Sequence, residues 1–211
     1  MWVNGRHVDP EHADWTAISA EIAAGLSKQV KAARLTTPTE LAIVKKPEAR
    51  TPTKRGPRDV PTGPDRTPQA KKDMIGRLGE LVVYHWLKDR FRNQDIDKAW
   101  VSRFGAMHKG KAWSDDLGYD FELHYDRRTW LIEVKSSQGD RRQFEMGESE
   151  VRAAREAARP RSGQRYVVIY VGNPATSSTT CIDILPNPMS GEADSMLQLL
   201  GEGVRFGFKR K

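Results

Sequence analysis

Apolar residues recur with helical spacing in two separate parts of the chain. Residues 15–34, WTAISAEIAAGLSKQVKAAR, place six of them along one stripe, and residues 72–90 show the same periodicity. Such stripes predict amphipathic helices. The first helix belongs to a predicted N-terminal helical segment over residues 1–35. The pattern leaves open whether this helix docks on the main domain, on a second copy of the chain or on another protein.

The two predicted helices are separated by residues 36–70, which lack a regular pattern. This stretch holds seven of the twelve prolines, and seven Lys or Arg against four Asp or Glu. Proline disfavours a helix or a central strand, and a high charge content disfavours a packed core. We therefore predict a flexible, basic, Pro-rich linker over residues 36–70 and a main domain over residues 71–211.

The main domain mixes strand patterns with helix patterns. Two strands joined by the short DRR connection predict an antiparallel hairpin. The elements predicted after the helix at 72–90 are a short strand near KAWVS (98–102), a loop through residue 117, strands at 119–125 and 129–135, a helix over 147–159, strands in RYVVIYVG and CIDILP, a short helix near 192–200 and an alternating VRFGFK segment. This order predicts an α/β fold with a mixed sheet flanked by helices.

The net charge of +7 and the pI near 9.6 favour polyanionic partners, although the basic linker contributes to the total. No apolar run approaches the ~18 residues of a membrane span, and the amino terminus has no signal-peptide pattern. We therefore expect a cytoplasmic protein without a membrane partner. Cys181 is the only cysteine, which excludes an intrachain disulfide and predicts a small buried strand residue. No glycine-rich loop has the spacing of a nucleotide-binding P-loop, which argues against an ATPase.

Three ionisable residues stand inside the two strands of the predicted hairpin. Asp120 alternates with the apolar residues of GYDFELHY, while Glu133 and Lys135 lie two apart in TWLIEVKSS and therefore project from the same face. Each one alone is typical of the exposed side of a strand. Together they are more informative, because a three-residue connection brings Asp120 close to Glu133 and Lys135.

Two neighbouring carboxylates repel each other unless a cation lies between them. Mg²⁺ resolves that conflict with oxygen ligands, and it commonly takes one or two carboxylates together with water and a substrate phosphate. Lys135, as an ammonium group, is able to orient or activate an attacking water beside a phosphate. The combination predicts metal-assisted hydrolysis of a phosphodiester, with Mn²⁺ expected to substitute for Mg²⁺.

Glu80 lies in IGRLGELVVYHWL, on the flank of the apolar stripe of the helix at 72–90. Gly76 and Gly79 precede it, and each lowers intrinsic helicity by roughly 1 kcal/mol relative to alanine. Close packing of the helix on the sheet would justify that cost, and it would bring Glu80 to the edge of the metal site. The alternative is an ordinary glutamate on a helix surface.

These segments carry a family resemblance. IGRLGELVVYHWL, GYDFEL, LIEVKSS, FEMGESEVRAAREA and YVVIYVGN, over roughly residues 72–188, resemble the PD-(D/E)xK nuclease superfamily and, within it, the Mrr-like branch known as the protein NO VEIN C-terminal domain. The resemblance implies a restriction-endonuclease-like fold, metal ligation by Asp120 and Glu133, a catalytic Lys135, and Glu80 as the helix acid that supports this metal site. Tyr119 stands where the motif name has proline.

Other polar residues have two interpretations each. Arg152, Arg155 and Arg159 share one face of the helix at 147–159, where they would contact a phosphate backbone or simply solvent. Glu150 suits the start of the same helix, where carboxylates are favoured, and the alternative is an active-site role. His108, in a basic Gly/Lys loop, is expected at the surface rather than at a metal.

The sequence therefore predicts a Mg²⁺-dependent endonuclease with a restriction-endonuclease-like core, acting on DNA in preference to RNA. The resemblance connects such a protein with phage defence, restriction or repair. The alternative is a catalytically inert nucleic-acid-binding or assembly module of a larger defence complex. A protein partner bound through the N-terminal helix, and a homodimer, remain open.

Overall fold

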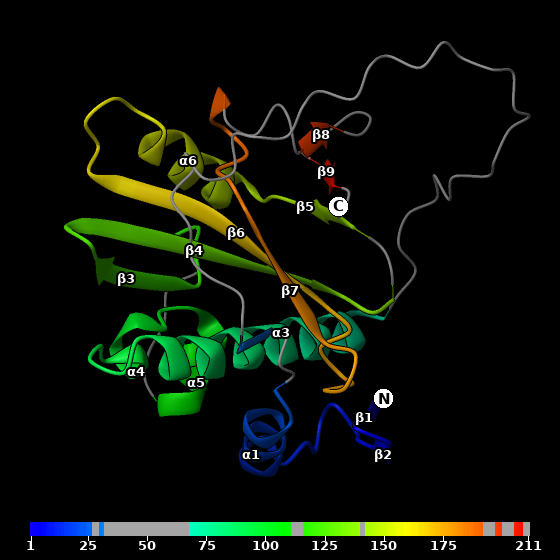
Figure 1. Cartoon of the computed structure of the whole chain (residues 1–211). Helices are drawn as coiled ribbons and strands as arrows, with labels where there is room; N and C mark the ends of the chain where they lie inside the picture. The colour runs from blue at the N-terminus through cyan, green and yellow to red at the C-terminus, as the bar shows by residue number, and fades with distance from the viewer. Residues whose placement is uncertain are drawn as a thin grey trace, which may run out of the picture.

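A four-stranded mixed sheet forms the centre of the computed structural model, which describes residues 1–26, 30–31, 68–110, 116–139, 142–191, 197–199 and 205–208. The strands, in spatial order, are β3 (Phe121–Tyr125), β4 (Arg128–Ser137), β6 (Gln164–Gly172) and β7 (Cys181–Leu185). β4 and β6 are parallel, and the outer pairs are antiparallel. Helices cover both faces (Figure 1), so the predicted mixed sheet flanked by helices is confirmed, and it is consistent with a restriction-endonuclease-like fold.

β3 and β4 form the predicted hairpin. Asp126 and Arg127 make the turn with φ of 53° and 58°, and a two-residue turn with positive φ suits the twist of paired strands. Phe121 pairs with Ile132 in the ladder, and the backbone N–H of Asp120 donates to the Ile132 carbonyl at 2.9 Å. The pairing therefore extends one residue beyond β3 and places Asp120 beside the middle of β4.

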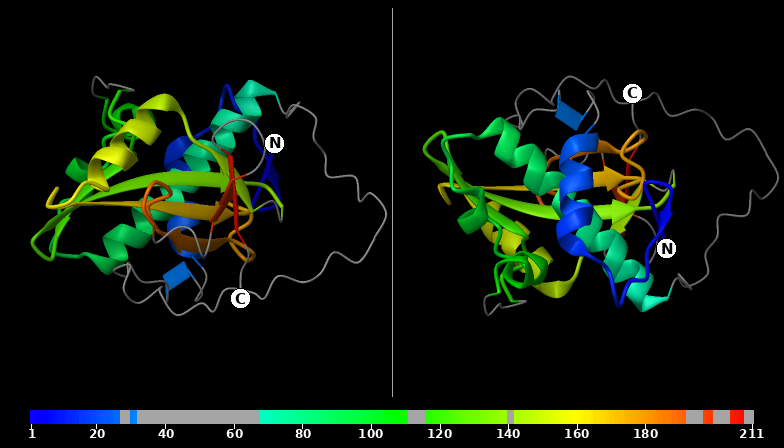
Figure 2. Two further views of the ribbon diagram at one scale, coloured as in Figure 1. Left: turned by 90° about the horizontal axis from the view of Figure 1, so that it is seen from above. Right: turned by 90° about the horizontal axis from the view of Figure 1, so that it is seen from below.

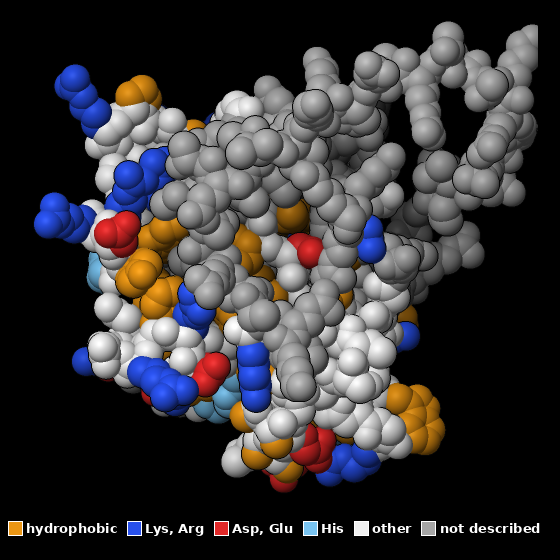
Figure 3. All heavy atoms as spheres, in the orientation of Figure 1, with side chains coloured by type: hydrophobic (Ala, Val, Ile, Leu, Met, Phe, Trp, Pro, Cys, Tyr) orange, Lys and Arg blue, Asp and Glu red, His pale blue; other side chains and the backbone are white. Residues whose placement is uncertain are grey.

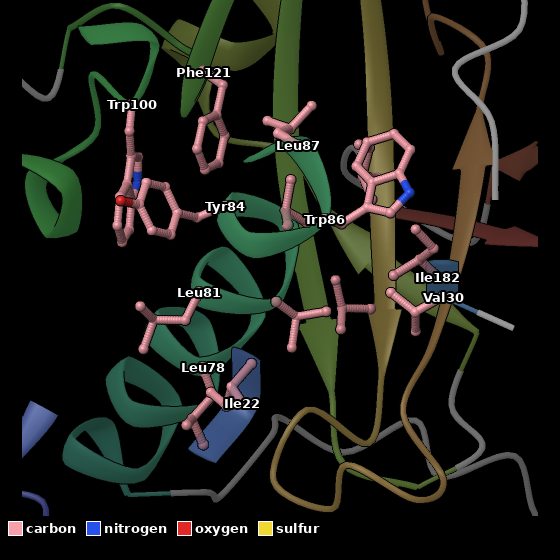
Figure 4. Close-up of a cluster of buried hydrophobic side chains, with 14 of the residues drawn as sticks. Ile22, Val30, Leu78, Leu81, Tyr84, Trp86, Leu87, Trp100, Phe121 and Ile182 are labelled. Carbon is pink, nitrogen blue, oxygen red and sulfur yellow. The ribbon is translucent and has the colours of Figure 1, made fainter. Parts of the chain in front are cut away.

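α3 (Gln69–Arg90) packs its apolar stripe on one face of the sheet, and Figure 4 shows its side chains Leu78, Leu81 and Leu87 in this core. A Cβ on Gly79 would lie 2.7 Å from the Ser136 Cβ of β4, so only glycine permits this approach. A Cβ on Gly76 would have an ordinary 3.6 Å contact with Phe104. The expected close packing of helix on sheet is thus confirmed at Gly79 and not at Gly76.

The N-terminal segment packs on α3 and belongs to the same core. α1 (Trp15–Gly25) begins after Asp14, whose carboxylate caps the first turn, and it buries Ile18 and Ile22. Ser19 Oγ and His85 Nε2 of α3 share a hydrogen bond of 2.9 Å. Figure 2 (right) shows α1 lying across α3. Of the docking alternatives that the sequence leaves open, the structure shows the one on the main domain.

The other face of the sheet is covered by α6 (Glu148–Ala157), which turns Ala154 and Ala157 inward. Gly118, with φ of 77°, lies directly against the start of this helix, because a Cβ on it would be 2.2 Å from the Ser149 carbonyl oxygen. The loop before β3 and the first turn of α6 are therefore in backbone contact. This contact fixes the distance between α6 and the strand hairpin.

Three predicted elements differ from the structure. The expected strand at 98–102 is instead the end of α4 (Ile96–Ala99), capped by Asp95, followed by an isolated bridge from Trp100 to Phe121. The expected loop contains α5 (Arg103–Lys109), which begins after the capping residue Ser102. Near 192–200 the described residues form a strand, not a helix. This strand, β8 (Leu197–Leu199), belongs to a second antiparallel sheet with β9 (Arg205–Phe208) and β5 (Gln143–Glu145).

The remaining elements are the strands β1 (Trp2–Val3) and β2 (Arg6–His7), which pair antiparallel at the amino terminus. The predicted linker over residues 36–70 lies outside the described residues up to residue 67, and α3 begins at Gln69. None of the described helices is both long enough and apolar enough to cross a membrane.

Candidate active site

Lys135 lies between two carboxylates that come from different elements. Its Nζ is 2.9 Å from Glu133 Oε1 on the same strand and 2.7 Å from Glu150 Oε2 on α6. The side chains of Lys135 and Glu150 are 17% and 20% exposed, so a small part of each reaches solvent. Burial lowers the pKa of Lys135, but the negative charges of Glu133 and Glu150 outweigh it and raise this pKa above its usual value. Lys135 is therefore a charged ammonium group.

Glu150 lies at the helix start, as one interpretation of its sequence position expected, and it also contacts Lys135. It is the third residue of α6. Its Oε2 accepts a hydrogen bond from the backbone N–H of Gly147 at 3.0 Å, which gives the N-cap residue of the helix a partner. The same oxygen accepts the ammonium of Lys135. The helix start therefore sets the position of a carboxylate that the sequence assigned to the site only as an alternative.

Asp120 is held against the strand that carries the other two residues. Its Oδ2 accepts the backbone N–H of Val134 at 2.8 Å. Desolvation, followed by the negative charge of Glu80, raises the pKa of Asp120 well above its usual value. For Glu133 the causes are desolvation and then the charge of Asp120, and its pKa is raised as well. The two carboxylates thus oppose each other, as the sequence predicts.

Glu80 is buried at 5% exposure and serves a different part of the site. Its Oε2 accepts hydrogen bonds from Trp100 Nε1 at 2.6 Å and from Ser102 Oγ. Burial raises the pKa of Glu80 to about 7, against the effect of these two donors. The backbone N–H groups of Val101 and Ser102 donate in turn to the Asp120 carbonyl at 2.9 and 3.2 Å. Glu80 therefore anchors the segment that holds Asp120 in place.

The structure brings Asp120, Glu133 and Lys135 together, and it places Glu80 behind them. Within the described part of the chain, no three His, Cys, Asp or Glu side chains converge in a geometry that would hold a metal ion. Two oxygen donors remain a fitting set, because Mg²⁺ commonly takes only one or two protein carboxylates. The raised pKa values of Asp120 and Glu133 show two buried acids that a cation would stabilise in their charged forms. Metal ligation by Glu80 remains a prediction.

Sequence reasoning missed several residues around the site. Tyr166 of β6 is buried and donates its hydroxyl to the Gly118 carbonyl at 3.1 Å, which ties the sheet to the loop before Asp120. Trp100 and Ser102 bind Glu80 across 20 and 22 residues of sequence. The local signal for this region is Ser102, a residue type that commonly caps the start of a helix, directly before α5. Of the other candidates, His108 packs against the rings of Tyr84 and Trp100, and Cys181 is half-buried in β7.

The mixed sheet is consistent with a restriction-endonuclease-like fold, and its β3–β4 hairpin brings two carboxylates and a lysine together. Residues 79–182 match the family model described as Protein NO VEIN, C-terminal. This family is associated with the PD-(D/E)xK-like nuclease fold. The matched region contains Glu80, Asp120, Glu133, Lys135 and Glu150. No curated protein and no solved structure matches the chain significantly.

Proposed function

We propose that this protein is a metal-dependent nuclease that hydrolyses phosphodiester bonds, with DNA as the favoured substrate. The observation that carries the proposal is the position of Lys135, whose ammonium is held by Glu133 and Glu150 beside the partly buried Asp120. An ordinary structural ion pair joins one lysine to one carboxylate. Lys135 instead contacts both Glu133 and Glu150 and has Asp120 nearby, at a site that remains partly open to solvent.

Asp120 and Glu133 would hold the Mg²⁺ ion. When bound, the cation supplies Lewis-acid stabilisation of the charge that develops on the phosphate. Because Lys135 is an ammonium group, it acts as a hydrogen-bond donor that orients the attacking water and stabilises phosphate oxygens. Glu150 also holds Lys135 Nζ, at 2.7 Å, so the ammonium would keep one carboxylate partner with Glu133 serving as a metal ligand. Glu80 acts through Trp100 and Ser102 as a positioning residue.

The experiment is a cleavage assay with purified full-length protein on plasmid, linear duplex, single-stranded and modified DNA and on RNA, with Mg²⁺, Mn²⁺ or a chelator. The wild type is compared with Glu133→Ala and with Glu148→Gln, a matched change of an exposed acid two residues from Glu150. We expect metal-dependent cleavage that Glu133→Ala abolishes and Glu148→Gln retains. Equal cleavage by the wild type and Glu133→Ala on every substrate would refute the proposal.

That same negative result would support the alternative, a nucleic-acid-binding or assembly module without turnover. The match to the NO VEIN C-terminal family supports a role in defence, restriction or repair as part of the proposal. Dependence on a partner protein is tested by repeating the assay in an extract of the native host.

A further inference from the structure

A second basic feature lies at the end of the sheet where β4 and β6 begin. A pocket of about 650 Å³ is formed there by the β3–β4 turn, the connection from α6 to β6 and the segment after β7. We call it the arginine pocket, because the described residues that line it include Arg127, Arg128, Arg159, Arg161 and Arg165 and no Asp or Glu. Figure 3 shows Lys and Arg side chains projecting at the left edge of the molecule, where Figure 1 places the β3–β4 turn and the connection from α6 to β6.

These arginines are poorly neutralised by the protein itself. Arg159 pairs with Glu156 at 2.7 Å, but this pair is exposed. Arg127, Arg128 and Arg161 form no ion pair with any described residue. The Nε of Arg165 is buried and has no hydrogen-bond partner among the described residues. A buried donor without an acceptor is costly, and a bound anion would satisfy it.

The backbone of the pocket is also unusual. Arg127 and Arg161 have φ of 58° and 62°, in the left-handed region that bulky side chains rarely adopt. For Arg127 this conformation is the one that the two-residue β3–β4 turn requires, so the positive φ values show how two separate loops place arginines at the rim of one pocket.

The pocket is connected to the candidate active site by α6. Arg152 and Arg155 are exposed on this helix, between Glu150 at its start and Arg159 at its end. Along β4, Lys135 lies seven positions after Arg128. A strand rises about 3.3 Å per residue, so about 23 Å separates them. One strand of a duplex advances about 3.4 Å per nucleotide, so this distance corresponds to about seven nucleotides.

We propose that the arginine pocket binds a phosphate ester of the nucleic-acid strand that reaches Lys135 along α6. The bidentate geometry of arginine suits phosphate oxygens, and no carboxylate among the described lining residues neutralises the positive charge. This inference rests on the proposed function only in taking nucleic acid as the ligand. A free nucleotide carries the same phosphate chemistry, and the test separates the two sources.

The test uses the full chain carrying Lys135→Ala, in EDTA, so that binding is measured without cleavage. Arg127→Asn and Arg161→Asn are combined, since Asn tolerates positive φ. The control combines Lys71→Gln and Lys98→Gln, two exposed lysines outside the pocket, with the same change of charge. Anisotropy of a labelled 20-base-pair duplex is followed over a salt series, and calorimetry measures AMP binding. Thermal unfolding confirms that each variant is folded.

We expect the pocket variant to bind the duplex about 10-fold more weakly, with a salt slope reduced by about 0.9 for each lost phosphate contact. The control should retain most of the affinity and the slope. Pocket and control variants with equal affinity and slope would overturn the inference. Loss of AMP binding with unchanged duplex binding would overturn it too, and assign the pocket to a free nucleotide.

These outcomes are independent of turnover. If the wild type cleaves nothing but the pocket variant still binds the duplex less tightly than the control does, the proposed nuclease function fails and the arginine pocket stands. If the wild type cleaves DNA and the pocket variant binds like the control, the nuclease function stands and the pocket inference fails.

Discussion

The carboxylate of Asp120 accepts the backbone N–H of Val134, the residue that separates Glu133 from Lys135, at 2.8 Å. One hydrogen bond therefore links the residue before β3 to the centre of the strand that carries the other two site residues. The spacing of the two carboxylates is set by the backbone of the hairpin. The backbone of the hairpin consequently keeps the two acids near each other, and the charge of Asp120 contributes to the raised pKa of Glu133.

Alanine substitution of Asp120, Glu133 or Lys135 should each reduce cleavage by on the order of 10²-fold or more, because one electrostatic stabiliser is typically worth ~3–4 kcal/mol in the transition state. Asp120→Asn is the sharper variant, since its amide oxygen still accepts from Val134 while the charge is lost. Single-turnover rates on duplex DNA measure the effect. Activity in Asp120→Asn close to that of the wild type would show that Asp120 is structural.

Glu150→Gln should lower cleavage by about 10-fold, because it removes one of the two charges that hold the Lys135 ammonium. The variant should also move the alkaline limit of the pH–rate profile downward, since the pKa of Lys135 is raised by Glu150. Glu148→Gln on the same helix is the matched control. An unchanged profile in Glu150→Gln would leave Glu150 with its capping role only.

The metal-free protein should lose stability as the pH rises from about 4.5 to about 7. The folded pKa of Glu80, about 7, lies above its ordinary value of 4.5, so the contribution of Glu80 is complete below pH 4.5 and is lost by pH 7. Asp120 and Glu133 shift in the same direction. For Glu80 alone the loss is on the order of 3 kcal/mol.

Urea unfolding in EDTA at a series of pH values measures this loss. Glu80→Gln should flatten the profile, because a neutral amide accepts from Trp100 and Ser102 without titrating, while Glu122→Gln should not. Mg²⁺ should restore more stability at pH 8 than at pH 5, since it binds the charged forms of Asp120 and Glu133. A flat profile in the wild type contradicts the prediction.

His85 should oppose part of this loss, because its contribution to stability changes with pH in the opposite direction. Burial, and then the positive charge of Lys88, lower the pKa of His85 from 6.5 to about 4. The stability that neutral His85 contributes is therefore present above pH 6.5 and is lost as the pH falls to about 4. We expect about 1 kcal/mol after allowance for the partial exposure of the ring.

Comparison of His85→Gln with His124→Gln isolates this contribution. His85→Gln should make the loss of stability with rising pH steeper and keep a partner for Ser19, whereas His124 is exposed and its substitution should leave the slope unchanged. Two-dimensional NMR of the imidazole groups gives an independent reading. A His85 pKa near 6.5 would contradict the expectation.

Limited proteolysis is expected to cut first within residues 36–70, and this prediction from the sequence is still to be tested. The packing of Ile18 and Ile22 in the core with α3 adds that the two fragments should remain associated after the cut. Gel filtration of the digest measures this association.

Ile22→Glu should release the N-terminal fragment, whereas Glu11→Gln should not. Separation of the wild-type fragments would contradict the prediction. It also follows that a chain beginning near Lys71 should be less stable than the full protein.

The local sequence pattern predicted those parts of the candidate site whose residues lie close together in the chain. The alternation in TWLIEVKSS placed Glu133 and Lys135 on one face, and the short connection placed Asp120 beside them, where its hydrogen bonds to Ile132 and Val134 hold it. The hydrogen-bond partners of Glu80 could not be predicted from the local pattern, because they are distant from it in the sequence. Trp100 and Ser102 meet Glu80 only through the turn and helices between residues 91 and 109, a region where capping by Asp95 and Ser102 outweighed the strand-like KAWVS pattern.

The contact of Glu150 with Lys135 could not be predicted from the sequence of α6 alone. The position of Glu150 at the start of the helix is visible in GESE, but its contact with Lys135 depends on how far α6 lies from the sheet. That distance is fixed by the contact of Gly118 with Ser149, which involves the backbone and leaves no periodic pattern. The docking of α1 was open for a similar reason, since an apolar stripe does not specify which surface covers it.

The placement of Lys135 between two acids also fixes a charge balance. With Asp120, Glu133, Glu150 and Lys135 ionised and Glu80 protonated, as it is below its pKa of about 7, three carboxylates and one ammonium leave the centre with a formal charge of −2. One divalent cation neutralises this charge, whereas one sodium ion leaves half of it. A second divalent ion would give the centre a positive charge in the absence of substrate, and the anionic phosphate of a substrate would offset that charge. We therefore expect the resting protein to take up a single divalent ion and to favour divalent over monovalent ions by charge alone.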